Sequence, residues 1–146
     1  MENMAILYGV PKVAYGIEGC TPFPMCVKSC AEYLGVAVTY SQIMAESGAA
    51  FRLVWDTSCW NGGNVDAIST FDDPAKIFVS GLRAMRRELK LLARTKETKK
   101  DDFISFIRKE IDEGNPVIAL GIIGPPEACV IAGYRDGGNT LMGCLM

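Results

Sequence analysis

Six cysteines and no histidine set the chemistry that this chain of 146 residues can perform. A cysteine thiolate is both a nucleophile and a metal ligand, and cysteine enzymes commonly use a histidine to generate it. No two cysteines have the Cys-x-x-Cys spacing and histidine is absent, so we expect neither a closed zinc site nor any cofactor. The cysteines are Cys20, Cys26, Cys30, Cys59, Cys129 and Cys144.

Cys20 is the first candidate nucleophile. It directly precedes Thr21 and Pro22, which are suited to the N-cap and the first position of a helix. The positive end of a helix favours a thiolate, and its free N–H groups can bind an oxyanion. The alternative is a half-buried loop cysteine. Cys26 is a second candidate, but Cys26 and Cys30 are four residues apart on one helical face, which predicts small core hydrophobes.

The polar loop at residues 56–66 is a second candidate site. It combines an aromatic ring, two amides and a carboxylate, a mixture that loops use to bind ligands. Asparagine and glycine are also what a tight turn requires, so a purely structural loop is the alternative. The predicted ligand-binding residues are Trp60, Asn61, Asn64 and Asp66.

The elements that must position these residues follow from apolar periodicity and turn residues. Helices are predicted at residues 22–34, 41–46, 72–89 and 101–113, and strands at 5–13, 51–55, 89–94, 116–123, 128–135 and 140–146. Asp136-Gly137-Gly138-Asn139 is a hairpin signal between the last two strands. Helices first and antiparallel strands last favour an α+β fold. Arg83, Arg86, Arg87 and Lys90 are predicted to form a solvated face of the third helix.

Composition narrows the class of protein. The length suits one domain over residues 1–146 with a real core, and the net charge of −2 with a pI near 5.2 argues against nucleic acid as a partner. The longest apolar run, residues 117–123, is too short to span a membrane, and the first residues lack a signal-peptide pattern, which predicts a cytoplasmic protein with free thiols. The chain ends within an apolar run, so that strand is either sheltered in the sheet or followed by further chain.

Several segments together resemble a known family. A cysteine before the first helix, the helix end Tyr33-Leu34-Gly35 and the later Gly133-Tyr134-Arg135-Asp136 are similar to the C39-like, papain-like cysteine peptidases. The longer segments 47–55 and 124–134 resemble a bacterial and archaeal branch of that superfamily, related to the N-terminal domain of the butirosin biosynthesis acyltransferase. The similarity covers nearly the whole chain.

This resemblance implies a papain-like (C39-like) fold with a nucleophilic cysteine at the start of the first helix and a histidine at the start of a strand. The family's histidine lies six residues before the glycine of the Gly-Tyr pair, and here that position is Glu127. A carboxylate beside a thiolate raises the pKa of the thiol, whereas an imidazolium lowers it. We therefore expect a cysteine peptidase or acyltransferase relative with altered or lost catalysis. Cys20 and Glu127 would be its active pair, or Cys20 would act with a histidine from another chain or from a segment not in this sequence.

A non-catalytic domain of the same fold, binding a small molecule or a peptide, is the alternative function, and a purely structural module is a third. Neither nucleic acid nor a membrane is expected as a partner, and the sequence leaves homo-oligomerisation open.

Overall fold

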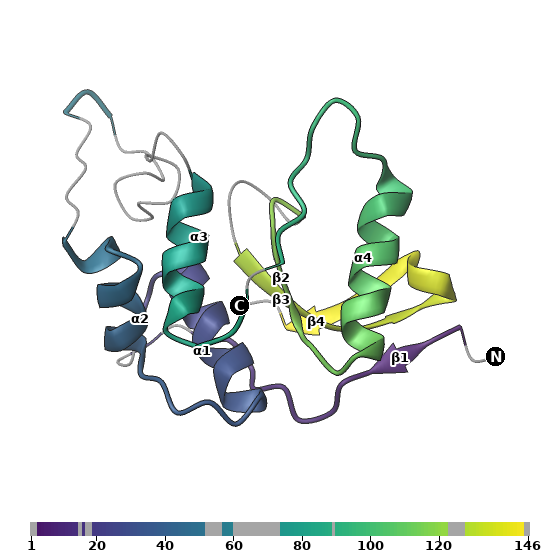
Figure 1. Ribbon diagram of the computed structural model, residues 1–146, viewed down its shortest axis with the longest axis horizontal. Coiled ribbons are helices and arrows are strands. Elements are labelled where there is room, and N and C mark those ends of the chain that lie inside the picture. The colour runs from purple at the N-terminus through teal and green to yellow at the C-terminus, as the bar shows by residue number, and fades with distance from the viewer. Residues whose placement is uncertain are drawn as a thin grey trace.

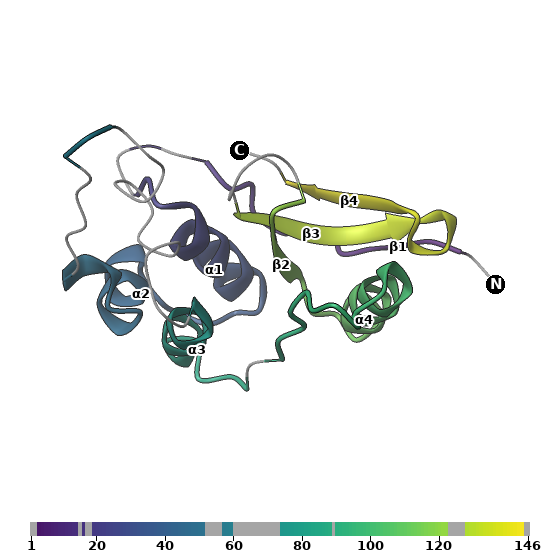
Figure 2. The same ribbon diagram turned by 90° about the horizontal axis from the view of Figure 1, so that it is seen from above.

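The computed structural model describes residues 3–14, 16, 19–51, 57–59, 74–88, 90–122 and 128–144. Its helices and strands form two neighbouring groups (Figures 1 and 2). One group contains α1 (Pro22–Tyr33), α2 (Tyr40–Glu46), the short 3-10 turn η1 (Ala49–Phe51) and α3 (Pro74–Arg83). The other contains α4 (Lys100–Asp112) and a sheet of β1 (Ala5–Ile6), β2 (Val117–Leu120), β3 (Ala128–Arg135) and β4 (Thr140–Cys144). The predicted α+β class is confirmed.

The first two helices begin and end within one residue of the predicted bounds. Thr21 is the N-cap of α1 in extended conformation, although its side chain makes no capping hydrogen bond. Gly35, with a φ of 69°, follows the last turn, a position where glycine avoids the steric cost of a side chain. Thr39 and Gln42 form a reciprocal capping box at the start of α2, which satisfies N–H groups that a helix end leaves free.

The third helix is shorter than predicted. α3 ends at Arg83, and Arg86 adopts a φ of 52°, a left-handed conformation that a helix cannot continue through. Arg86, Arg87 and Lys90 therefore belong to the α3–α4 connection and do not share a helix face, so the predicted solvated face is wrong. The strand predicted at 89–94 is also wrong, because residues 90–94 of the described chain pair with no strand and make no backbone–backbone hydrogen bond.

β3 is the centre of the sheet. It pairs antiparallel with β1 and β2 along one side and with β4 along the other. The hairpin signal is confirmed, because the chain turns from β3 to β4 through η4 (Asp136–Gly138). The first predicted strand, residues 5–13, shrinks to Ala5–Ile6, and of the strand predicted at 51–55 only Phe51 is described, within η1.

Two apolar clusters hold the groups together. In one, Phe23, Cys26 and Val27 of α1 pack with Ala128 and Val130 of β3. In the other, Ile107 and Ile111 of α4 pack on Ile131 and Tyr134 of β3. Since β3 contributes to both clusters, it joins the helical group to α4. Among the described residues, no helix has the length and apolar character needed to cross a membrane.

Candidate functional site

Cys20 lies next to the first turn of α1 and follows a hydrogen-bonded backbone segment. Gly19 is buried and exchanges two backbone hydrogen bonds with Gly16, at 3.1 and 3.2 Å. A side chain at Gly19 would place its Cβ only 2.6 Å from Cε2 of Tyr40, so the ring requires glycine here. The Tyr40 hydroxyl also accepts a hydrogen bond from the Thr21 N–H at 3.2 Å. Cys20 between them is exposed, as a reactive thiol requires.

Cys26 and Cys30 are buried in the apolar core of α1, as the sequence predicts. Burial raises the pKa of both thiols to about 12, and for Cys26 repulsion from Cys30 and Cys129 adds to that effect. Burial also raises the pKa of Cys129 at the start of β3. These thiols stay protonated near neutral pH, so Cys26 does not have the properties of an activated nucleophile.

The remaining predicted site residues lie outside the described part of the chain. These are Glu127, Trp60, Asn61, Asn64 and Asp66. Cys20 is thus the one member of the predicted sites whose surroundings can be described. Within the described residues, no group of three or more cysteine or carboxylate side chains could hold a metal ion.

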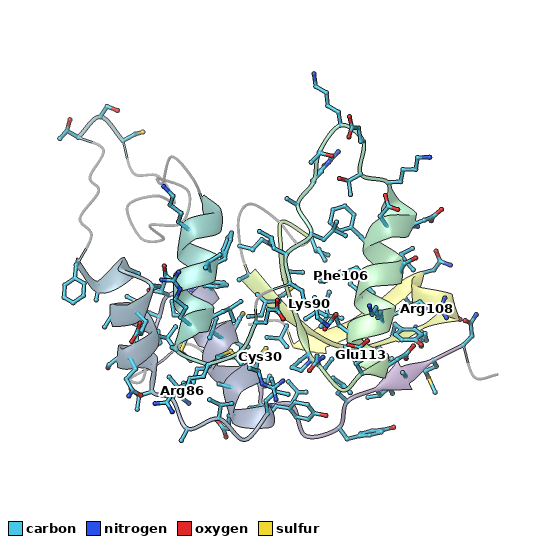
Figure 3. The ribbon with its side chains drawn as sticks, in the orientation of Figure 1. Cys30, Arg86, Lys90, Phe106, Arg108 and Glu113 are labelled. Carbon is cyan, nitrogen blue, oxygen red and sulfur yellow. The ribbon has the colours of Figure 1, made fainter. Side chains whose placement is uncertain are left out.

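A cavity of about 1040 Å³, which the sequence analysis does not predict, lies between the two groups of elements. α1 and α3 border it on one side and α4 on the other, while β2 and residues 90–94 of the α3–α4 connection complete its walls. Cys30 and Phe106, labelled in Figure 3, come from these opposite sides. Aliphatic and aromatic side chains dominate the lining, including Phe23, Phe78, Leu82, Phe103, Ile104 and Ile118.

Apolar side chains also reach solvent at this cavity. Leu91 and Ile122 are each 50% exposed and Leu120 is 38% exposed, and all three line the cavity. Large apolar side chains that are exposed together commonly mark a binding surface. A sequence signal existed for one of them, because Leu91-Leu92 interrupts an otherwise basic stretch.

A hydrogen-bonded polar group closes one end of the cavity. Glu110 is 7% exposed; its Oε1 accepts a hydrogen bond from Nζ of Lys90 at 2.7 Å and its Oε2 accepts one from Asn115 at 3.1 Å. Lys90 also donates to Glu113 at 3.2 Å, and Figure 3 labels both residues. Arg87 donates to Asn115 at 3.4 Å. The hydrogen bonds to Glu110 and Glu113 raise the pKa of Lys90. The arrangement anchors the α3–α4 connection to the end of α4.

Comparisons with models of protein families, with curated proteins and with solved structures give no match for this chain.

Proposed function

We propose that this chain is a non-catalytic ligand-binding domain of papain-like ancestry, and that its ligand is an apolar small molecule. The cavity is the observation that carries the proposal. Its volume of about 1040 Å³ is just above the roughly 300–1,000 Å³ found for small-molecule sites. Its lining is mainly apolar and includes the exposed side chains of Leu91, Leu120 and Ile122. An apolar ligand gains about 25 cal/mol for each Å² of apolar surface removed from water.

The state of the thiols supports a function without covalent catalysis. Cys30 lines the cavity but is buried with a pKa of about 12, so it contributes an apolar surface and no nucleophile. The chain also has no histidine to act as a general base. α1 packs on β3, the strand that follows Glu127 in the sequence, and the resemblance implies a nucleophile at the start of the first helix and a histidine at the start of a strand.

A direct binding measurement tests this proposal. We expect the neutral dye Nile red to bind the folded chain saturably with one molecule per chain, and decanol to displace it. The matched variants are Ala93→Trp, which adds a ring at an exposed position of the cavity lining, and Ala45→Trp, at an exposed position on α2 outside it. Ala93→Trp should weaken binding several-fold and Ala45→Trp should not. Absence of saturable binding, or equal effects of the two variants, would overturn the proposal.

A thiol-dependent hydrolase or acyltransferase is the second candidate, favoured by one observation. Cys20 is exposed beside the first turn of α1, where the backbone is held by Gly19 and Tyr40. Glu127 would be its partner. Iodoacetamide labelling at neutral pH, followed by mass spectrometry of each cysteine, decides the matter. Labelling of Cys20 no faster than that of a free cysteine peptide removes this candidate, and labelling at least tenfold faster would favour it over the binding domain.

A further inference from the structure

The charged side chains of the cavity are distributed unevenly between its two ends. The lining contains four cationic residues (Arg87, Lys90, Arg94, Lys100) and two acidic ones (Glu88, Glu110). At the end near the last turn of α4, the cations Arg87 and Lys90 occur with the two acidic residues of the lining, Glu88 and Glu110, and Lys90 is paired with Glu110. Charge at this end is therefore largely balanced within the protein.

The other end lies at the first turn of α4 and carries Arg94 and Lys100. The Lys100 ammonium donates to the neutral Oδ1 of Asn139, at 3.4 Å, and among the described residues no carboxylate forms an ion pair with either cation. Asp101 and Asp102 belong to the same turn but do not line the cavity, and Asp102 accepts the Lys99 N–H at 2.8 Å, which directs it to the helix end. An anion that approached from the cavity would meet two cations.

The backbone fixes these two cations on either side of a tight turn. Thr98 donates its hydroxyl to the Ala93 carbonyl oxygen at 3.1 Å, and the Thr95 N–H donates to the Thr98 hydroxyl at 3.1 Å. These bonds fold residues 93–98 so that Arg94 and Lys100 face the cavity from the two arms of the turn. Lys100 also begins α4, at the positive end of the helix dipole, where lysine is disfavoured for helix stability and an anion is favoured.

We propose that the ligand is a straight-chain carboxylate, whose carboxyl group binds Arg94 and Lys100 and whose hydrocarbon chain lies along α4 towards Glu110. This inference rests on the proposed function and adds the chemical class and the orientation of the ligand. The chain length follows from the helix. Lys100 and Glu110 are ten residues apart in α4, which corresponds to about 15 Å along its axis, a length that suits a medium-length acyl chain.

The experiment compares three ligands that share one hydrocarbon chain: decanoate, decanol and decylamine. Displacement of Nile red from the wild-type protein should require about tenfold less decanoate than decanol, because two cations contact the carboxylate, and decylamine should be the weakest. Raising the salt concentration should reduce the advantage of decanoate.

Two double variants test whether Arg94 and Lys100 bind the carboxylate. Arg94→Gln with Lys100→Gln should bind decanoate no better than decanol, while binding of decanol stays within about twofold of wild type. Arg83→Gln with Lys99→Gln removes the same charge from exposed positions outside the cavity lining and should retain the preference. Thermal unfolding of both double variants shows that each is folded.

The outcomes separate the two proposals. Equal affinity of the wild-type protein for decanoate and decanol would overturn the carboxylate inference and leave the apolar cavity as the binding site. The carboxylate inference is also overturned if the control double variant loses the preference for decanoate over decanol as fully as Arg94→Gln with Lys100→Gln does. Failure of every decyl ligand to displace the dye would overturn both proposals.

Discussion

The ammonium of Lys90 lies 2.7 Å from the Oε1 atom of Glu110, a carboxylate that is almost completely buried. Twenty residues separate the two in sequence, and Lys90 belongs to a segment with no regular structure. This ion pair therefore fixes the position of the α3–α4 connection, and with it one wall of the cavity. Its energetic value comes from Glu110, because a buried carboxylate without partners is costly.

Glu110→Gln is expected to destabilise the fold more than Glu113→Gln. Glu110 accepts hydrogen bonds at both oxygens within the protein, whereas Glu113 is 45% exposed and its charge is largely screened by solvent. We expect a loss of about 1–3 kcal/mol in the free energy of unfolding for Glu110→Gln and at most about 1 kcal/mol for Glu113→Gln. Urea denaturation measures both, and equal losses would contradict the role given to Glu110.

The same ion pair has a predictable pH dependence. The pKa of Lys90 is raised by its hydrogen bonds to Glu110 and Glu113. A pKa raised on folding gives stability that is fully present below the pKa of the unfolded lysine and is lost as the pH rises through the folded value. Stability from this group should therefore be constant at neutral pH and fall only in strongly alkaline solution. Urea midpoints of wild type and Lys90→Met, measured across the alkaline range, should converge as the pH increases; a constant difference would contradict this.

Alanine substitutions at Gly19 and Gly16 test how the backbone beside Cys20 is held in place. In Gly19→Ala the new methyl group collides with the Tyr40 ring and with the Met25 sulfur, at 2.6 and 2.7 Å, whereas nothing lies within 4 Å of a methyl group at Gly16. Overpacking of this kind costs about 1–3 kcal/mol, and Gly16→Ala should stay within about 0.5 kcal/mol of wild type. Thermal unfolding of the two variants tests the difference, and similar stabilities would mean that Tyr40 does not hold Gly19.

Arg86→Gly should stabilise the protein. Arg86 has a φ of 52°, where a side chain costs about 1–2 kcal/mol, and glycine removes most of that cost while adding some unfolded-state entropy. We expect a net gain of about 0.5–1 kcal/mol. Arg83→Gly, at the last residue of α3, should lose up to about 1 kcal/mol, because glycine is a poor helix former. Chemical denaturation gives both values, and a loss of stability in Arg86→Gly would show that its side chain makes a compensating contact.

The buried thiols predict both slow labelling and alkaline sensitivity. Cys26 and Cys30 should react with a thiol reagent only as fast as the protein unfolds, while exposed Cys20 reacts freely. Their pKa rises on folding from about 9 to about 12, so the unfolded chain loses these protons first and stability falls as the pH rises from 9 to 12. Cys26→Ala should reduce the slope of the unfolding free energy against pH by the equivalent of up to one proton. A slope unchanged by the substitution would mean that groups other than Cys26 cause the loss of stability.

Local signals predicted much of the fold. Thr21-Pro22 at one end and Gly35 at the other delimit α1 to within two residues, and the glycines after Asp136 locate the β3–β4 turn. Such signals act through backbone geometry over a few residues, so the structure that they predict does not depend on distant contacts. The end of α3 could not be found in this way, because Arg86 adopts a conformation that usually selects glycine or asparagine.

The candidate site was much harder to predict. The cavity walls come from α1, α3, α4, β2 and the α3–α4 connection, and no periodic pattern links positions as distant as Phe23 and Phe106. The sequence also does not indicate which charged residues pair across the fold. Lys90 and Arg94 share a basic stretch, yet Lys90 is paired with Glu110, and Arg94 forms no ion pair among the described residues. The burial of Cys26 and Cys30 was predictable, since it follows from helical spacing alone.

The pairing of Ala5 with Tyr134 has a consequence for how the protein is made. These two residues are roughly 130 positions apart, and such distant contacts form slowly because a long loop must first be closed. During synthesis at about 5–20 residues per second, β1 waits on the order of ten seconds before β3 leaves the ribosome. The helical group can begin to compact during that time, but the sheet cannot. Completion of the sheet therefore waits for β3, and β1 is among the last elements to reach its place.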